Sequence, residues 1–433
     1  MRGKGMNGFF APPADTRTGA FLLRHRLCAS AYDWEEQLER LLREMDRVRA
    51  GETGSVKMIP VRLGAPVLPE SPCTVTAIDV GGTNVRAAAV TLDRSGILDI
   101  ARAPAFRTPG VGARMSAREF FRILAQGCAE RLTAERIGIC FSLAAKALPD
   151  GDAEVTAGAK QIDVPDLPGQ RVGASFRAAA AELGLPCGQR ITVINDTLAA
   201  ALGGGLAARE GTFGGCIGFI YGTGTNVAYR EPSGALINVE SGAYCGFPAG
   251  DIDDLFDRDL VDPGCDRFEK MVSGGYQGGL MRLVLRCAEG EGLLSPGFSE
   301  RLSRALAGAA LSSADISAFS SDPTGGGRIA AACADGEDRA AVMDICSAMT
   351  ARSALLCSVT LTAALLRAGI GMSPSAPAFI TAEGSTYLRQ KGFREMLDAC
   401  MEEYARRRRG LYCALHPVPD AVLKGTALAA LPR

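Results

Sequence analysis

The residues from Asp33 to Gly51 carry a helical pattern of hydrophobic and polar positions. In DWEEQLERLLREMDRVRAG the apolar residues recur at steps of three and four, acidic residues come early, arginines come late, and a glycine closes the run. This pattern predicts an amphipathic helix whose charges form a solvated face. Residues 1 to about 30 show no sustained period and are dominated by Gly, Pro, Arg and Ala, so we expect a mobile tail there.

Two segments place strand-like runs on either side of a glycine-rich turn. In TAIDVGGTNVRAAAV the runs Thr76–Val80 and Val85–Val90 flank Gly81-Gly82-Thr83-Asn84. The segment GCIGFIYGTGTNVAYRE repeats this arrangement about 140 positions later. Two such strand-turn-strand units suggest a duplicated architecture.

The remaining pattern mixes strands and helices, as in an α/β protein. Helices are predicted near Ser116–Glu130, Val172–Leu183 and Thr197–Leu206, over 265–290 and most of 295–370, and in LRQKGFREMLDACMEEYARRRRG. Strands are predicted at Arg136–Ser142, at Arg190–Asp196 and in PAFITAEGST. The longest apolar run, Ala354–Leu366, is shorter than the roughly 20 residues that a bilayer requires, so we expect a buried helix.

The composition argues against several classes of function. A chain of 433 residues suggests two to three domains or one large two-lobed unit. Its 47 Lys and Arg nearly balance 48 Asp and Glu, which favours a small-molecule partner over nucleic acid or a membrane. Fourteen cysteines without a C-x-x-C pair indicate buried thiols in a reducing cytoplasm, and two histidines leave little for a His-based metal site or a catalytic triad.

The two glycine turns suit phosphate. Glycine lets backbone N–H groups approach a ligand, and the neighbouring Thr and Asn add short polar groups, which together form a concavity for an anion. A plain tight hairpin is the alternative for either turn alone. Two turns of the same chemistry, Gly81–Asn84 and Gly222–Asn226, can close on one polyphosphate from opposite sides.

Two aspartates stand where phosphate chemistry needs acids. Asp79 beside the first turn would be repelled by phosphate unless a cation lay between them, and Mg²⁺ is the cation that accompanies nucleotide phosphates. Asp196 lies at a strand-to-helix junction, where it or Thr197 could simply cap the helix. A carboxylate there could instead accept a hydroxyl proton during phosphoryl transfer.

Nine stretches of the chain, in order from about Asp33 to Ala430, resemble motifs of the hexokinase family. They are SVKMIP, AIDVGGTNVRAAAV, CFSLAAKALPDG, VINDTLAAAL, YGTGTNVAY, INVESGAYCG, FEKMVSGGY, EGSTYLRQKGF and KGTALAAL. The resemblance implies an α/β, two-lobed, actin-like (ribonuclease-H-like) fold with a central cleft. The expected small lobe is 74–196 with 417–433, and the expected large lobe is 31–73 with 197–416.

The resemblance also implies an ATP-dependent hexose kinase with Mg²⁺, a monomer or homodimer, and glucose as the leading substrate. Asp196 would be the general base toward the sugar 6-hydroxyl. The implied sugar ligands are Ser142, Lys160, Asn195, Asn226, Glu240 and Glu269. Asp79 would serve Mg²⁺ through water. The implied phosphate and nucleotide residues are Gly81, Gly82, Thr83, Asn84, Gly222, Thr223, Gly224, Gly384, Ser385, Thr386, Lys424 and Gly425.

Departures from the family pattern keep two rivals open. Gly158–Ile162 replaces the usual Trp-Thr-Lys-Gly-Phe of the sugar loop, and Ala421–Gly425 replaces Gly-Ser-Gly-Lys-Gly. One rival is a sugar-binding regulatory protein that catalyses weakly, and the other is an actin-like filament or ATPase module. The acids Asp79 and Asp196 count against the first, while Glu240 and Glu269 count against the second.

Overall fold

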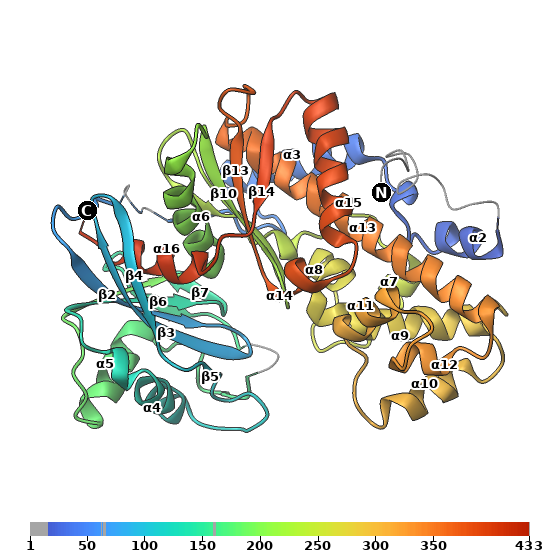
Figure 1. Ribbon diagram of the computed structural model, residues 1–433, viewed down its shortest axis with the longest axis horizontal. Coiled ribbons are helices and arrows are strands. Elements are labelled where there is room, and N and C mark those ends of the chain that lie inside the picture. The colour runs from blue at the N-terminus through green and yellow to red at the C-terminus, as the bar shows by residue number, and fades with distance from the viewer. Residues whose placement is uncertain (1–15, 62, 64–65, 159–161, 433) are drawn as a thin grey trace.

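The computed structural model describes residues 16–61, 63, 66–158 and 162–432 (Figure 1). The chain folds into two lobes, each built around one main sheet (Figure 1). The first sheet has the order β4-β3-β2-β6-β9. Its strands are β2 (Cys73–Val80), β3 (Asn84–Asp93), β4 (Gly96–Arg102), β6 (Arg136–Phe141) and β9 (Arg190–Ile194), with β5 (Phe106–Arg107) paired to β3.

The second sheet repeats this topology. Its order is β1-β12-β11-β10-β13-β14. Its strands are β1 (Ile59–Val61), β10 (Gly215–Tyr221), β11 (Thr225–Arg230), β12 (Leu236–Asn238), β13 (Ala378–Glu383) and β14 (Cys413–His416). In both sheets an antiparallel three-stranded meander is followed by two parallel strands, which confirms the duplicated architecture. A separate hairpin joins β7 (Ala145–Ala147) and β8 (Ala153–Val155).

Parallel pairing gathers the functional segments at two strand edges. In the first sheet β2, β6 and β9 run parallel, so Asp79, Ser142 and Asn195 come at or just beyond the same carboxyl edge. In the second sheet Ile220 pairs with Glu383, so the turns that begin at Gly222 and Gly384 leave their strands side by side.

Two helices join the lobes. Helix α6 (Asp196–Ala207) packs on β10 and β13, and helix α16 (Ala421–Ala429) packs on β2 and β6. The two helices also pack against each other, through glycines that allow the backbones to approach closely. A Cβ on Gly425 would lie 1.8 Å from the Ala199 carbonyl oxygen, and one on Gly203 would lie 2.1 Å from that of Ala421.

Most remaining helices build the larger lobe (Figure 1). They are α3 (Trp34–Arg49), α7 (Asp251–Arg258), α8 (Arg267–Val272), α9 (Gly274–Gly290), α10 (Phe298–Leu306), α11 (Ser313–Ser321), α12 (Arg328–Ala332), α13 (Gly336–Ala368), α14 (Ser385–Arg389), α15 (Phe393–Cys400) and a π-helix (Met401–Arg408). Helix α13 is long and apolar enough to cross a membrane, but 94% of its most apolar 18-residue stretch is buried inside the protein. This confirms the predicted core helix. Helices α4 (Ala117–Gly127) and α5 (Val172–Glu182) belong to the smaller lobe.

Three sequence-based expectations need correction. The predicted tail is wrong for residues 17–30, because helix α2 (Arg17–Arg24) buries Phe21 and Leu22 in the cluster around α9 to α13; residues 1–15 lie outside the described residues. The strand predicted to reach Asp196 ends at Ile194, because Asn195 caps helix α6 and Asp196 is its first residue. The predicted terminal helix is interrupted at Gly392, whose φ of +81° favours glycine. The exact lobe boundaries stay predictions.

Candidate active site

Asp196 is the first residue of α6, and its neighbour Asn195 is the N-cap. The Asn195 side-chain oxygen accepts a hydrogen bond of 2.9 Å from the Thr197 N–H. The Asp196 carboxylate accepts bonds from the same N–H (2.7 Å) and from the Thr197 hydroxyl (3.1 Å). Because Asn195 supplies the cap, Asp196 is not required for it.

Asp196 lies close to two other carboxylates. Burial raises its pKa, the charge of Asp79 raises it further, and hydrogen bonds from Thr197 and Ser142 partly offset the rise. Burial and then the charge of Asp196 raise the pKa of Glu240 from 4.5 to about 7. Asp79 lies in β2 and Ser142 follows β6 of the first sheet, whereas Glu240 follows β12 of the second, so this acidic site draws on both lobes.

Asp79 is buried and already paired with a cation. Its Oδ2 accepts hydrogen bonds from Arg86 Nε (2.9 Å) and Nη2 (2.6 Å). The two residues face each other across the β2–β3 hairpin. Sequence reasoning missed Arg86, although the predicted hairpin register would have placed it opposite the acid.

On the second sheet, Asn226 and Glu240 share a polar cluster with Asn238. The Asn226 Nδ2 group donates to Asn238 Oδ1 (2.7 Å) and lies 3.5 Å from Glu240 Oε1, while Asn238 Nδ2 donates to the same Glu240 oxygen at 2.5 Å. Glu240 adopts a left-handed backbone with φ of 52°. Asn238 was not predicted, because an Asn at the end of a short strand carries no distinctive sequence signal.

Glu269 reaches the second glycine turn from the first turn of α8. Its Oε2 accepts a hydrogen bond of 3.1 Å from the Thr225 N–H. A Cβ on Gly224 would lie 2.4 Å from that oxygen, and a Cβ on Gly242 would lie 2.9 Å from it. Because Gly224 and Gly242 have no side chains, there is room for the Glu269 carboxylate. Gly242 stands two residues after Glu240, so Glu269 lies against the segment that carries Glu240.

The second turn also contacts the predicted nucleotide segment. The Gly222 carbonyl accepts hydrogen bonds from the Thr386 hydroxyl and from the Gly274 N–H, each 2.9 Å. Gly384 has a φ of +118°, and a Cβ there would lie 2.3 Å from the Tyr221 carbonyl oxygen. The turn at Gly222 and the start of α14 are therefore adjacent, and Gly274 is a contributor that sequence reasoning missed.

The first turn is closed by its own backbone and by one distant residue. The Gly81 N–H donates to the Asn84 carbonyl at 3.1 Å, and Thr108 donates its hydroxyl to the Gly81 carbonyl at 2.7 Å. Thr83 and Asn84 are exposed. Thr108 was not predicted, since its link to the turn depends on a loop crossing 27 positions away.

Two predicted residues have a different status. Lys160 lies outside the described residues. Gly425 lies at the contact between α6 and α16, so close packing already explains a glycine at that position. Its place at the nucleotide, with that of the neighbouring Lys424, stays a prediction.

Comparison with known proteins identifies the family. Two family models, both described as hexokinase, match residues 23–205 and 216–432. Hexokinase-1 of Oryza sativa subsp. japonica is 25% identical over 405 residues, covering 82% of this chain and 77% of that protein. Hexokinase-1 of Schizosaccharomyces pombe is 26% identical over 279 residues, and that match covers 57% of this chain and only 56% of the relative.

A solved structure shares the fold. The hexokinase from Schistosoma mansoni, complexed with glucose, superposes with a TM-score of 0.76 at 21% identity, covering 95% of this chain and 98% of that one. This likeness establishes the two-lobed, actin-like α/β fold. From the family models and this fold together, the chain belongs to the hexokinase family, a family of phosphotransferases that have an alcohol group as acceptor.

Proposed function

We propose that this protein transfers the terminal phosphoryl group of ATP to the 6-hydroxyl of a hexose, with glucose as the leading substrate. One observation carries the proposal. Asp79 and Ser142 lie in or just after strands of the first sheet, Glu240 follows a strand of the second, and Asp196 begins the helix between them. These four residues nevertheless lie close enough to shift one another's ionisation or to hydrogen-bond. An acid-lined site between two lobes suits a ligand that is rich in hydroxyl donors.

Asp196 is the proposed general base. It would accept the proton of the 6-hydroxyl as that oxygen attacks the phosphorus. Burial and Asp79 raise its pKa, and a base whose pKa moves toward the working pH gains driving force for accepting a proton. Ser142, Asn195, Asn226, Glu240 and Glu269 would hydrogen-bond the other hydroxyls, so a sugar that lacks one of them would leave a buried partner unpaired.

The residues present fit Mg²⁺ with nucleotide. The described residues contain no group of three or more His, Cys, Asp or Glu side chains that could hold a metal ion by themselves. Mg²⁺ bound to a nucleotide does not need such a group, because it takes few protein carboxylates and keeps several waters. Asp79 would hold the ion through water, with Arg86 keeping the carboxylate in place. The ion would neutralise charge on the phosphates. The glycine turns at 81–84 and 222–224 would bind the phosphate oxygens.

A substrate panel tests the proposal. Purified protein would be assayed with several hexoses, each against ATP, GTP and polyphosphate, and kcat/KM would be measured for every pair. We expect glucose with ATP to give the highest kcat/KM. Hexose binding without phosphorylation by any donor would refute the proposed activity and favour a sugar-binding regulatory protein.

A further inference from the structure

All fourteen cysteines lie in described parts of the chain and are free thiols. Of these, Cys245 and Cys265 are exposed to solvent, and the others are buried or partly buried. The Cys245 thiol lies beside the residue that precedes Cys265. Cys245 Sγ lies 3.4 Å from the Gly264 carbonyl oxygen, and the Phe268 N–H donates to the Tyr244 carbonyl at 3.0 Å. Two contacts therefore hold the segment at 244–245 against the segment at 264–268.

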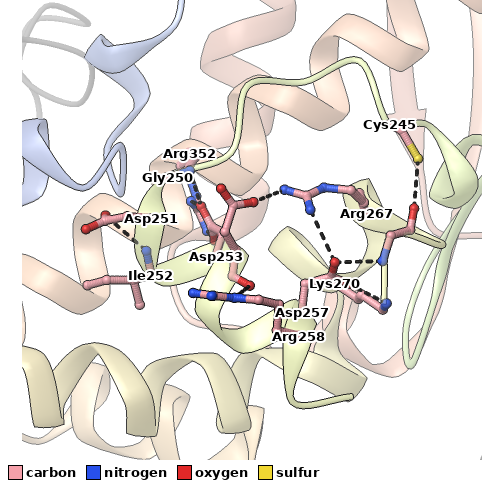
Figure 2. A network of polar contacts seen from close by, with 12 residues as sticks. Cys245, Gly250, Asp251, Ile252, Asp253, Asp257, Arg258, Arg267, Lys270 and Arg352 are labelled. Atoms are coloured by element: carbon pink, nitrogen blue, oxygen red, sulfur yellow. Dashed lines mark hydrogen bonds and ion pairs between the residues drawn. The ribbon is translucent and has the colours of Figure 1, made fainter. Parts of the chain in front are cut away.

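The peptide geometry places the thiols within reach of a disulfide. A carbonyl oxygen of a trans peptide lies about 3 Å from the following Cα, so Cys245 Sγ lies within about 6 Å of the Cys265 Cα. A disulfide needs Cα atoms roughly 4.4–6.8 Å apart, which this arrangement allows with side-chain rotation and a small adjustment of exposed loops. In Figure 2 the sulfur of Cys245 points toward the segment that leads into α8.

A buried ion pair holds the turn that carries Cys265. Asp257 of α7 accepts a hydrogen bond of 2.7 Å from the Gly264 N–H through Oδ2. Its other oxygen accepts from Lys270 Nζ at 2.5 Å, and Lys270, only 3% exposed, also donates to the Asp262 carbonyl at 2.6 Å (Figure 2). These buried contacts fix the turn at Gly264, whose carbonyl lies 3.4 Å from Cys245 Sγ.

The pair joins the two segments that carry the sugar-side acids. Glu240 comes five residues before Cys245, and Glu269 comes four residues after Cys265 in the first turn of α8. Any covalent bond between the thiols would tie these segments together. The glycine turn at 222–224 and the segment 384–386 contact each other on the nucleotide side, and neither carries one of the two cysteines, although Glu269 also contacts the Thr225 N–H at the end of that turn.

We propose that Cys245 and Cys265 form a reversible disulfide that lowers the affinity of the site for hexose. The oxidant is a low-molecular-weight disulfide such as glutathione disulfide. One protein thiolate attacks it, forms a mixed disulfide and releases one glutathione thiol; the second protein thiolate then displaces the other glutathione. Two protein thiols lose two protons and two electrons, and one external disulfide becomes two thiols.

The effect on hexose follows from the position of the link. Forming it turns Cys245 Sγ away from the Ala243 and Gly264 carbonyls, which lie 3.2 and 3.4 Å from it. It also restricts how Glu240 and Glu269 adjust around a sugar. We therefore expect a weaker interaction with hexose and a smaller effect on ATP, because the linked segments carry both sugar-side acids, whereas they reach the nucleotide side through the contacts of α8 and α9 with the second glycine turn. This regulatory part rests on the proposed function.

Mass mapping and kinetics test the two parts separately. The full-length protein would be equilibrated with glutathione buffers of increasing oxidised fraction, digested without reduction and searched for a peptide linking Cys245 to Cys265. We expect the linked peptide, a several-fold higher KM for glucose, a clearly smaller change in the KM for ATP, and full reversal by dithiothreitol. Cys245→Ser and Cys265→Ser should lose both the link and the change in KM, whereas Cys73→Ser, at a less exposed thiol at the start of β2, should keep both.

Each contrary outcome has a distinct meaning. Glutathione adducts on the separate cysteines without a linked peptide would overturn the disulfide. A linked peptide with an unchanged KM for glucose, or with a KM for ATP that rises as much as that for glucose, would overturn the control of hexose affinity. Because mass mapping does not require activity, a protein that fails to phosphorylate any hexose would refute the proposed function and leave the test of the disulfide intact.

Discussion

Replacing Glu240 by Gln should change how stability depends on pH. Burial, and then the charge of Asp196, raise the pKa of Glu240 from 4.5 to about 7. The folded protein therefore holds this proton more tightly than the unfolded chain does. As pH rises from about 4.5 to about 7 the unfolded chain releases the proton first, so the free energy of unfolding falls across that window.

The size of the effect follows from the two pKa values. Each pKa unit corresponds to about 1.4 kcal/mol, so the wild type should lose about 3 kcal/mol between pH 4.5 and pH 7 through this group alone. The Gln variant keeps an amide that does not titrate, so it should lack this loss. The hydrogen bond that Asn238 donates to the carboxylate lowers this pKa, and the value of about 7 already includes that effect.

Urea unfolding at about pH 5 and about pH 8 would measure the difference for both proteins. We expect the wild type to lose more stability than Glu240→Gln on going to the higher pH. A matched control is Glu300→Gln, because Glu300 lies exposed on α10 with a side chain 77% accessible and should leave the pH dependence unchanged. Equal pH dependence in wild type and Glu240→Gln would refute the reasoning.

Three further substitutions probe the packing around the site. Gly224→Ala would put a Cβ 2.4 Å from the flexible Glu269 carboxylate, so the KM for glucose should rise at least several-fold with little change in Tm; a large fall in Tm with an unchanged KM would contradict this. Arg352→Met would leave the buried Asp253 carboxylate without its cation, and urea unfolding should show a loss of about 3–5 kcal/mol, a result that an unchanged midpoint would exclude. Gly425→Ala would put a Cβ 1.8 Å from the Ala199 carbonyl oxygen, and overpacking at this backbone contact should cost about 1–3 kcal/mol in the same measurement; wild-type stability would show that α6 and α16 can separate freely.

Local patterns in the sequence predicted individual helices and strands correctly. The strands around both glycine turns and the helix after Asp33 follow from periodicity, and the buried core of α13 follows from a continuous apolar run. Each of these patterns spans one continuous element. The acids at strand ends could be placed at one edge once parallel pairing was assumed. The family resemblance then assigned roles that no local pattern contains.

What could not be predicted depends on contacts between distant parts of the chain. Helix α2 is short, and its apolar residues gain stability only against the cluster around α9 to α13. Arg352 resembles any polar residue within an apolar helix, yet it is fully buried because Asp253, 99 positions earlier, neutralises it. Thr108 holds the first turn from a loop outside the hairpin. Such pairings require three-dimensional structure.

Replacing Asp196 by Asn tests the central claim most directly. Asn has nearly the same shape and can still accept the hydrogen bond from the Thr197 N–H, but it cannot act as a base at neutral pH. A coupled assay with glucose and Mg-ATP would give the rate, and calorimetry would give glucose binding. The account predicts that phosphorylation falls by about 10²–10⁴-fold while glucose binding persists. Wild-type activity in the variant would contradict it.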